Sequence, residues 1–190
     1  STLLFEPAVL TTSFLAILTD LEPEIRTAKP GQLVSVEFPF LRRLSSVGDA
    51  PVGGAVETWS EFLAQGRSLP PAIVDATAAS VQPSDPGMLF FSSGTTDKPK
   101  GILNSHRAVA IQLWRWRRLY DDLDDDVRCW QANGLFWSGA FSMAVGVTFS
   151  HGGLLVLQPT FEAAEALELI QAERVNLPLC WPHQWSRLTE

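Results

Sequence analysis

Cysteine and positive charge are both scarce in this sequence. Its 190 residues include two cysteines, Cys129 and Cys180, and 14 basic against 21 acidic residues. The cysteines form no CxxC pair and no histidine lies at ligand spacing, so we expect two reduced thiols and a cytoplasmic protein. The N-terminal STLLFEPAVL lacks the positive region of a signal peptide. The net charge of −7 argues against general binding to nucleic acids or anionic membranes, which need a surplus of positive charge.

Charged side chains are missing altogether between Cys129 and Phe161. A membrane span needs about 20 predominantly apolar residues. Here polar residues such as Asn133 and Ser138 interrupt the apolar run, and His151-Gly152-Gly153 ends it. We therefore expect a buried helix followed by a buried strand, and no membrane span.

Several familiar functional motifs are also absent. No GxSxG sequence is present, so a hydrolase has no support. His151 and His183 stand alone, which favours structural roles over metal binding. The stretch WRWRR at 114–118 interleaves aromatic and basic residues, as in proteins that bind single-stranded nucleic acid. The acidic run DDLDDD at 121–126 follows directly, so we interpret these arginines as part of a helix surface and expect no nucleic-acid partner.

Strand-like and helix-like segments alternate along the chain. Strands are expected at residues 3–5, 33–38, 88–91, 128–130, 154–157 and 175–180, and a short strand or turn at residues 102–103. Helices are expected at residues 14–21, 59–65, 106–120, 136–149 and 161–174 and from Pro182. Residues 42–57 and 66–86 are interpreted as a loop and a surface connection. This alternation predicts an α/β fold with a mostly parallel sheet flanked by helices.

One loop between two strands has the composition of a phosphate-binding site. It lies within FFSSGTTDKPKG, from Phe90 to Gly101. The backbone N–H groups of a glycine turn can surround an anion, hydroxyls add donors, and a lysine adds positive charge. A solvated Ser/Thr turn has the same composition. The P-loop pattern GxxxxGK[ST] fails, because Pro99 precedes Lys100 and Gly101 follows it.

This loop resembles the phosphate-binding motif of the adenylate-forming enzyme superfamily, which includes acyl-CoA synthetases, luciferases and the adenylation domains of peptide synthetases. Each restricted position of that motif matches from Phe91 to Gly101 except Asp97, where the family usually has glycine. Aspartate tolerates a left-handed backbone better than most residues. Its carboxylate is nevertheless unfavourable beside a triphosphate.

Later segments extend the resemblance. ANGLFWSGAF is similar to a family motif, Pro-Leu-Phe-His-x-x-Gly, that borders the acyl pocket. Leu135 and Phe136 match it, whereas Gly134 and Trp137 replace the proline and the histidine. Trp137 either narrows the acyl tunnel or is an ordinary core tryptophan. ILNSHRAVA also resembles the family, and its His106 is expected either to pack or to support residues of the site, and not to act in catalysis.

The resemblance implies a partial AMP-binding domain over residues 1–190, from the large N-terminal domain of an acyl-CoA synthetase, with a phosphate loop at 91–101. The family's activity is ATP-dependent formation of an acyl adenylate followed by ligation to CoA. Lys100 is the implied catalytic residue. The implied phosphate-binding residues are Ser92, Ser93, Gly94, Thr95, Thr96, Lys100 and Gly101. The implied residues of the acyl pocket are Phe136, Trp137 and Gly139.

The family's Tyr-Gly-x-Thr-Glu segment, its hinge and its C-terminal domain are not found in this sequence. The resemblance therefore implies that the Mg²⁺ ligand lies outside the chain and that these residues do not turn over substrate alone. A non-catalytic nucleotide-binding or interaction module that keeps the fold is the alternative.

Overall fold

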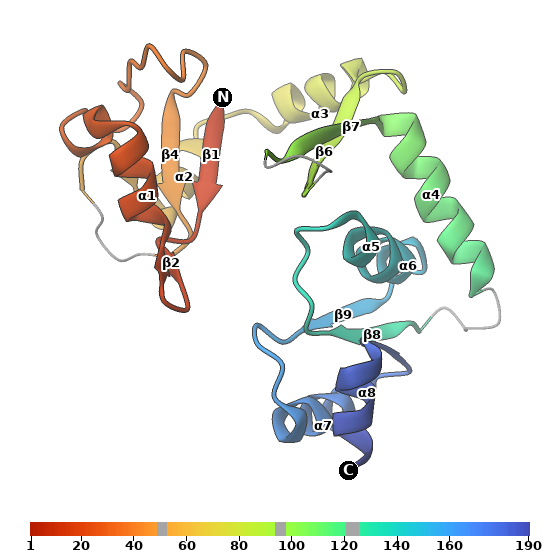
Figure 1. Cartoon of the computed structure of the whole chain (residues 1–190). Coiled ribbons are helices and arrows are strands. Elements are labelled where there is room, and N and C mark those ends of the chain that lie inside the picture. Colours follow the sequence, from red (N-terminus) through yellow and green to blue (C-terminus); the bar gives the residue numbers. More distant parts are fainter. Residues whose placement is uncertain (49–52, 94–97, 121–125) are drawn as a thin grey trace. The chain divides into compact units, whose positions relative to one another are not determined.

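The computed structural model describes residues 1–48, 53–93, 98–120 and 126–190. They form two compact units, Ser1–Ser80 and Val81–Glu190 (Figure 1). Each unit combines helices with a three-stranded parallel sheet, and two antiparallel hairpins complete the described strands. The predicted α/β class is confirmed. No helix in the described ranges is both long and apolar enough to cross a membrane.

The first unit contains the parallel sheet β1-β4-β5. Its strands are β1 (Thr2–Phe5), β2 (Ala8–Val9), β3 (Thr12–Ser13), β4 (Arg43–Ser46) and β5 (Val56–Glu57). Its helices are α1 (Phe14–Leu21), the 3-10 turn η1 (Pro23–Arg26), α2 (Trp59–Gly66) and α3 (Pro71–Ser80). Ser13 caps α1, because its Oγ accepts the Ala16 N–H at 3.1 Å. Pro23 begins η1 just after α1 ends.

Two predictions for the first unit are wrong. The expected strand at 33–38 is irregular, and the strand is β4, inside the expected loop. The alternation Val34, Val36 is real, but these side chains point outward and are 73% and 93% exposed. The serines of β4 carry a weak strand signal, yet β4 lies between β1 and β5 and is buried there. Helix α3 was also missed, since an exposed helix rich in alanine has no apolar face to mark it.

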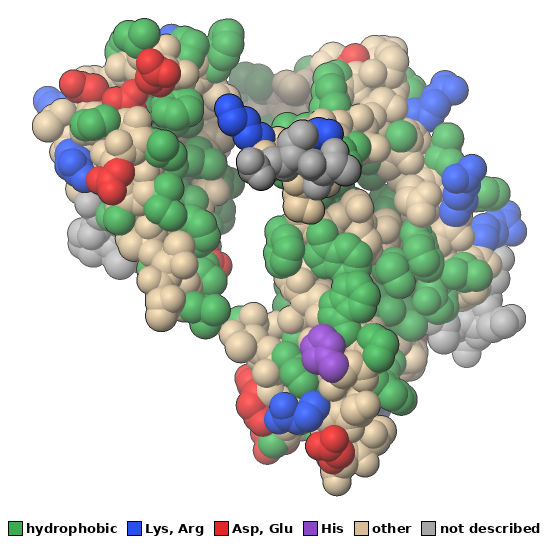
Figure 2. Space-filling model, viewed as in Figure 1, with side chains coloured by type: hydrophobic (Ala, Val, Ile, Leu, Met, Phe, Trp, Pro, Cys, Tyr) green, Lys and Arg blue, Asp and Glu red, His purple; other side chains and the backbone are tan. Residues whose placement is uncertain are grey.

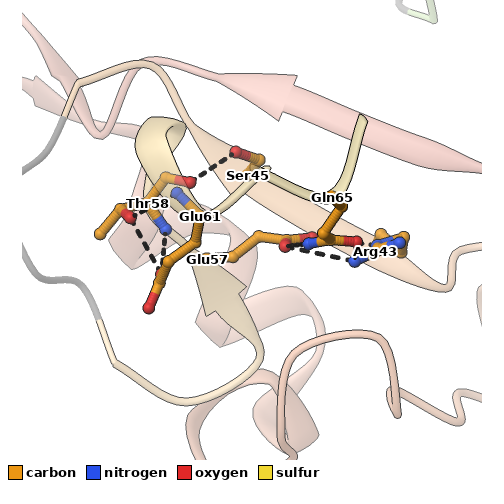
Figure 3. Close-up of polar contacts among 6 residues, drawn as sticks. All are labelled: Arg43, Ser45, Glu57, Thr58, Glu61 and Gln65. Atoms are coloured by element: carbon orange, nitrogen blue, oxygen red, sulfur yellow. Dashed lines mark hydrogen bonds and ion pairs between the residues drawn. The ribbon is translucent and has the colours of Figure 1, made fainter. Parts of the chain in front are cut away.

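A buried carboxylate fastens α2 to the sheet. Glu57, at the end of β5, is 2% exposed. Arg43 donates from Nε to Glu57 Oε1 at 3.0 Å, and Gln65 of α2 hydrogen-bonds to both of these side chains. Figure 3 shows the three side chains in a row, beside the capping box in which Thr58 and Glu61 close the start of α2.

The second unit matches the sequence prediction closely. Its strands are β6 (Pro86–Ser92), β7 (Lys100–Ser105), β8 (Arg128–Gln131), β9 (Leu154–Leu157) and β10 (Leu177–Leu179). Its helices are α4 (His106–Leu119), α5 (Ser138–Ala140), α6 (Val147–Ser150), α7 (Ala163–Ala172) and α8 (Pro182–Thr189), and the π-helix η2 (Phe141–Gly146) joins α5 to α6. The sheet order is β10-β8-β9, and both pairings are parallel.

The helical stretch α5-η2-α6 forms the centre of the second unit. Ala144 and Val147 are buried with Val127, Cys129 and Leu177 in one hydrophobic cluster. Helix α4 packs closely on η2, since a Cβ added to Gly146 would lie 2.3 Å from Leu113 Cδ2. Figure 2 shows hydrophobic side chains gathered where Figure 1 places α5 and α6. This stretch is the buried helix expected from the uncharged segment of the sequence.

Candidate functional site

The phosphate-loop sequence joins the two strands of an antiparallel hairpin. In the β6–β7 register Ser92 faces Lys100, and Phe91 faces Gly101. Opposed residues of an antiparallel pair point to the same side. The hydroxyl of Ser92 and the ammonium of Lys100 therefore lie on one face at the base of the loop. Ser92 is half-buried, whereas Ser93 and Lys100 are exposed to solvent.

Glycine at position 101 lets two apolar side chains cover the other face of the hairpin. A Cβ there would lie 3.2 Å from Leu89 Cδ1 and 3.6 Å from a ring carbon of Phe91. The predicted phosphate-binding residues Gly94, Thr95 and Thr96, and the variant Asp97, lie outside the described residues.

The start of α4 is tied to the hairpin. Ser105 caps the helix by accepting the Ala108 N–H at 3.3 Å, and the His106 N–H donates to the Asp85 carbonyl at 3.1 Å. Gly87 of β6 lies so close that a Cβ would be 2.8 Å from His106 N. The His106 side chain is exposed, so its expected role stays a prediction, whereas its backbone N–H fixes the start of α4 against the end of the hairpin that lies away from the loop.

Two of the three predicted acyl-pocket residues meet at a second place in this unit. Trp137 precedes α5 and stacks on Trp181, with ring centroids 5.3 Å apart and planes at 23°. Its ring also lies over Gly139, where a Cβ would be 1.9 Å from Trp137 Cζ3. Phe136 does not join them, because it is 81% exposed and its ring turns toward Gly134.

The Trp137–Trp181 pair borders a small cavity of about 240 Å³. Its remaining lining residues are Gln131, Asn133, Gly139, Ala140, Met143, Ala144, Leu179 and Cys180. The cavity lies at the carboxyl ends of the parallel strands β8 and β10, where ligands bind in open α/β sheets. Gln131 and Asn133 supply amide groups to an otherwise apolar wall. The sequence reasoning missed Trp181, although a tryptophan at the end of a predicted parallel strand was the available signal.

A larger cavity of about 590 Å³ lies between the hairpin, α4 and η2. Phe90 of β6 and Phe141 of η2 meet there, with ring centroids 6.3 Å apart and planes at 58°. Phe90 is two residues before Ser92 on the same strand. The strand that leads into the phosphate loop is therefore packed directly on the helical stretch that borders the smaller cavity.

Neither cysteine has the environment of a reactive thiol. Burial raises the pKa of Cys129 to about 11, and it also raises the pKa of Cys180. Both thiols are protonated at neutral pH, so neither is activated as a nucleophile. Within the described ranges, no group of three or more His, Cys, Asp or Glu side chains could hold a metal ion.

The family model "AMP-binding enzyme" matches residues 9–190. The chain belongs to this family. A CoA ligase of Mycobacterium tuberculosis is 31% identical over 140 residues, which cover 74% of this chain and 27% of the ligase. Indoleacetate–CoA ligase of Aromatoleum aromaticum is 28% identical over 172 residues, which cover 88% and 32%.

Solved structures agree on the fold. The anthranilate CoA ligase AuaEII, in complex with anthranoyl-AMP, aligns with a TM-score of 0.69 at 18% identity, covering 98% of this chain and 32% of the ligase. The N-terminal domain of FACL13 from Mycobacterium tuberculosis aligns with a TM-score of 0.56 at 15% identity, over 100% of this chain and 51% of that domain. The chain thus spans 27% and 32% of the lengths of the two curated relatives described above.

Proposed function

We propose that the full gene product joins a carboxylic acid to the α-phosphate of ATP, releases pyrophosphate, and passes the acyl group to CoA. The observation that carries this proposal is the hairpin register that sets Ser92 opposite Lys100 at the base of the family's phosphate loop. The family membership and the CoA ligases among the relatives support the same reaction.

In this proposal the loop acts on the β- and γ-phosphates. Lys100 balances the charge that develops on departing pyrophosphate, and Ser93 with the loop residues Gly94, Thr95 and Thr96 donates hydrogen bonds. Ser92 and Gly101 hold the two ends of the loop in register. Mg²⁺ would supply further positive charge to the phosphates, and we propose no ligand for it among the described residues. Such catalysis is positional and electrostatic, and needs no covalent intermediate with the protein.

The acid is proposed to bind against Trp137 and Gly139. A carboxylate must approach the α-phosphate while its apolar part leaves water, and the small cavity offers an apolar wall in the same unit as the loop. Phe136 is a weaker candidate, because its ring is exposed. The relatives are named for acids as different as indoleacetate and medium-chain acyl groups. A cytoplasmic location is also proposed, and the two free cysteines support it.

Asp97 favours a second candidate, a module that keeps the fold and lacks the chemistry. Its carboxylate stands where the family usually has glycine in the phosphate loop, and a negative charge there opposes triphosphate binding.

Carboxylate-dependent ATP–pyrophosphate exchange on the full gene product tests the first candidate. We expect exchange with at least one acid from a set of short, medium, long and aromatic acids, and its loss in Lys100→Ala. Arg107→Ala, which removes an exposed charge from α4 at the other end of the hairpin, should leave exchange unchanged. A folded protein that binds ATP and exchanges with none of the acids would favour the second candidate.

A further inference from the structure

Two cavities of the second unit share part of their walls. Gly139 and Met143 border both the cavity of about 240 Å³ and the cavity of about 590 Å³. They lie four positions apart on the stretch α5-η2, so they fall near one face of the helix. Gly139 has no side chain. Met143 is therefore the side chain that both cavities have in common along this face.

The smaller cavity has the size and wall of a site for a compact ring. Pockets that take drug-sized ligands measure roughly 300–1,000 Å³, and this one is smaller. The Trp137–Trp181 stack presents a rigid aromatic wall. A further ring can add to such a stack in an offset or edge-to-face arrangement, which a linear chain cannot do.

Met143 lies at the wall that the two cavities share. A methionine is long and unbranched, so it fills irregular gaps and can be shortened without adding a polar group. An acid too long for the smaller cavity would have to pass this side chain to use the space near Phe90 and Phe141. Shortening Met143 would join the two spaces.

We propose that the smaller cavity binds the apolar part of a compact, ring-bearing carboxylic acid, and that Trp181 and Met143 determine this specificity. Trp181 favours a ring over a chain of equal carbon number, and Met143 excludes longer chains. This inference rests on the proposed acid activation, because it assigns the substrate class of that same site.

Alkylation of Cys180 offers a readout that does not depend on catalysis. Cys180 lines the smaller cavity and is half-buried, whereas Cys129 is 0% exposed. Maleimide labelling of the folded full gene product, followed by peptide mass spectrometry, measures the Cys180 rate alone. The acids to compare are phenylacetate and octanoate, which have the same number of carbons, and the longer dodecanoate.

We expect phenylacetate to slow Cys180 alkylation at concentrations about tenfold below those needed with octanoate, and dodecanoate to have no effect. Trp181→Leu should remove the preference for the ring. Met143→Ala should let dodecanoate protect Cys180, whereas Met88→Ala, which shortens the other methionine of the larger cavity, should not.

Equal protection by phenylacetate and octanoate, or no protection by any acid, would overturn the inference. The inference would also be overturned if Met143→Ala left the protection of Cys180 by the three acids unchanged. Exchange assays on the same variants distinguish a failure of the proposed acid site from a failure of the proposed adenylation reaction. Protection with the expected pattern but without exchange keeps the binding site and rejects the adenylation reaction, whereas exchange without protection rejects the site alone.

Discussion

The ring of Trp137 occupies the space that a side chain at Gly139 would need, with Trp137 Cζ3 1.9 Å from the position of a Cβ. The ring is held there by its stack on Trp181. The shape of the smaller cavity therefore depends on a residue that contributes no side chain of its own.

Gly139→Ala should displace the Trp137 ring and weaken acid binding while the protein stays folded. The far end of one side chain moves more easily than a backbone segment, so the change should be local. Near-ultraviolet circular dichroism should report the loss of the Trp–Trp stack, and the exchange assay should show a raised KM for the acid. Gly139→Ala combined with Trp137→Leu relieves the clash, and the double variant should bind no worse than Trp137→Leu alone. Additive losses would contradict this account.

Lys100→Ala should lower kcat for exchange far more than it raises the KM for the acid, because the lysine charge is needed where pyrophosphate departs. A loss of about a hundredfold or more is the expected size for a single electrostatic group in an active site. Lys98→Ala is the matched control, as Lys98 is also exposed but lies between the two strands, before β7 begins. Equal losses in both variants would indicate a general effect of charge.

Asp97→Gly should strengthen ATP binding, since it restores the residue usual in the family and removes a like charge near the phosphates. At a separation near 4 Å in water such a charge costs about 1 kcal/mol, which corresponds to about a fivefold change in affinity. Isothermal titration with ATP, compared at low and high salt, measures it. Asp97→Asn removes the charge without introducing glycine, so it separates the effect of charge from that of backbone geometry. An unchanged ATP affinity in both variants would show that Asp97 does not weaken ATP binding.

Arg43→Met should destabilise the first unit, because it leaves the buried Glu57 without its cation. Breaking a buried ion pair costs roughly 3–5 kcal/mol, and about 2–3 kcal/mol is expected here because Arg43 is 37% exposed. Chemical denaturation of the protein measures the free energy of unfolding. Arg43→Met with Glu57→Gln removes both charges and should recover most of the loss. A double variant as unstable as Arg43→Met would show that the loss of stability comes from lost packing and not from the unpaired charge.

The folded protein should lose stability as the pH rises from 9 to 11 in a way that depends on Cys129. Burial holds this thiol protonated up to a pKa of about 11, whereas the unfolded chain ionises near 9.0. The protonated Cys129 thiol contributes its full stabilisation below pH 9. Between pH 9 and pH 11 this contribution to the free energy of unfolding falls by about 2–3 kcal/mol. The free energy of unfolding should fall less steeply with pH in Cys129→Val, and parallel pH profiles would contradict the assignment.

The sequence alone predicted those features whose signal is local. Strand β6 and the loop after it were predictable because an apolar run leads straight into Gly, Ser and Thr residues, and α8 because Pro182 marks a first helical residue. The antiparallel pairing of β6 with β7 was not predicted. The Trp137–Trp181 contact was not, since it joins segments that only the tertiary fold brings together. Strand β4 was missed for a related reason. Ser45 and Ser46 are buried by the strands on either side of them, and nothing in their own chemistry requires it.

The π-helix η2 affects how this protein can be compared with its relatives. A π-turn holds more residues than an α-turn, so each extra residue rotates all later side chains by about 100° around the helix axis. Suppose that this stretch is aligned without a gap to a relative that has a plain α-helix here. The residues after Gly146 will then be matched to residues on a different face of the relative's helix. When specificity residues of a relative are mapped onto this chain, the segments before and after η2 should therefore be aligned separately.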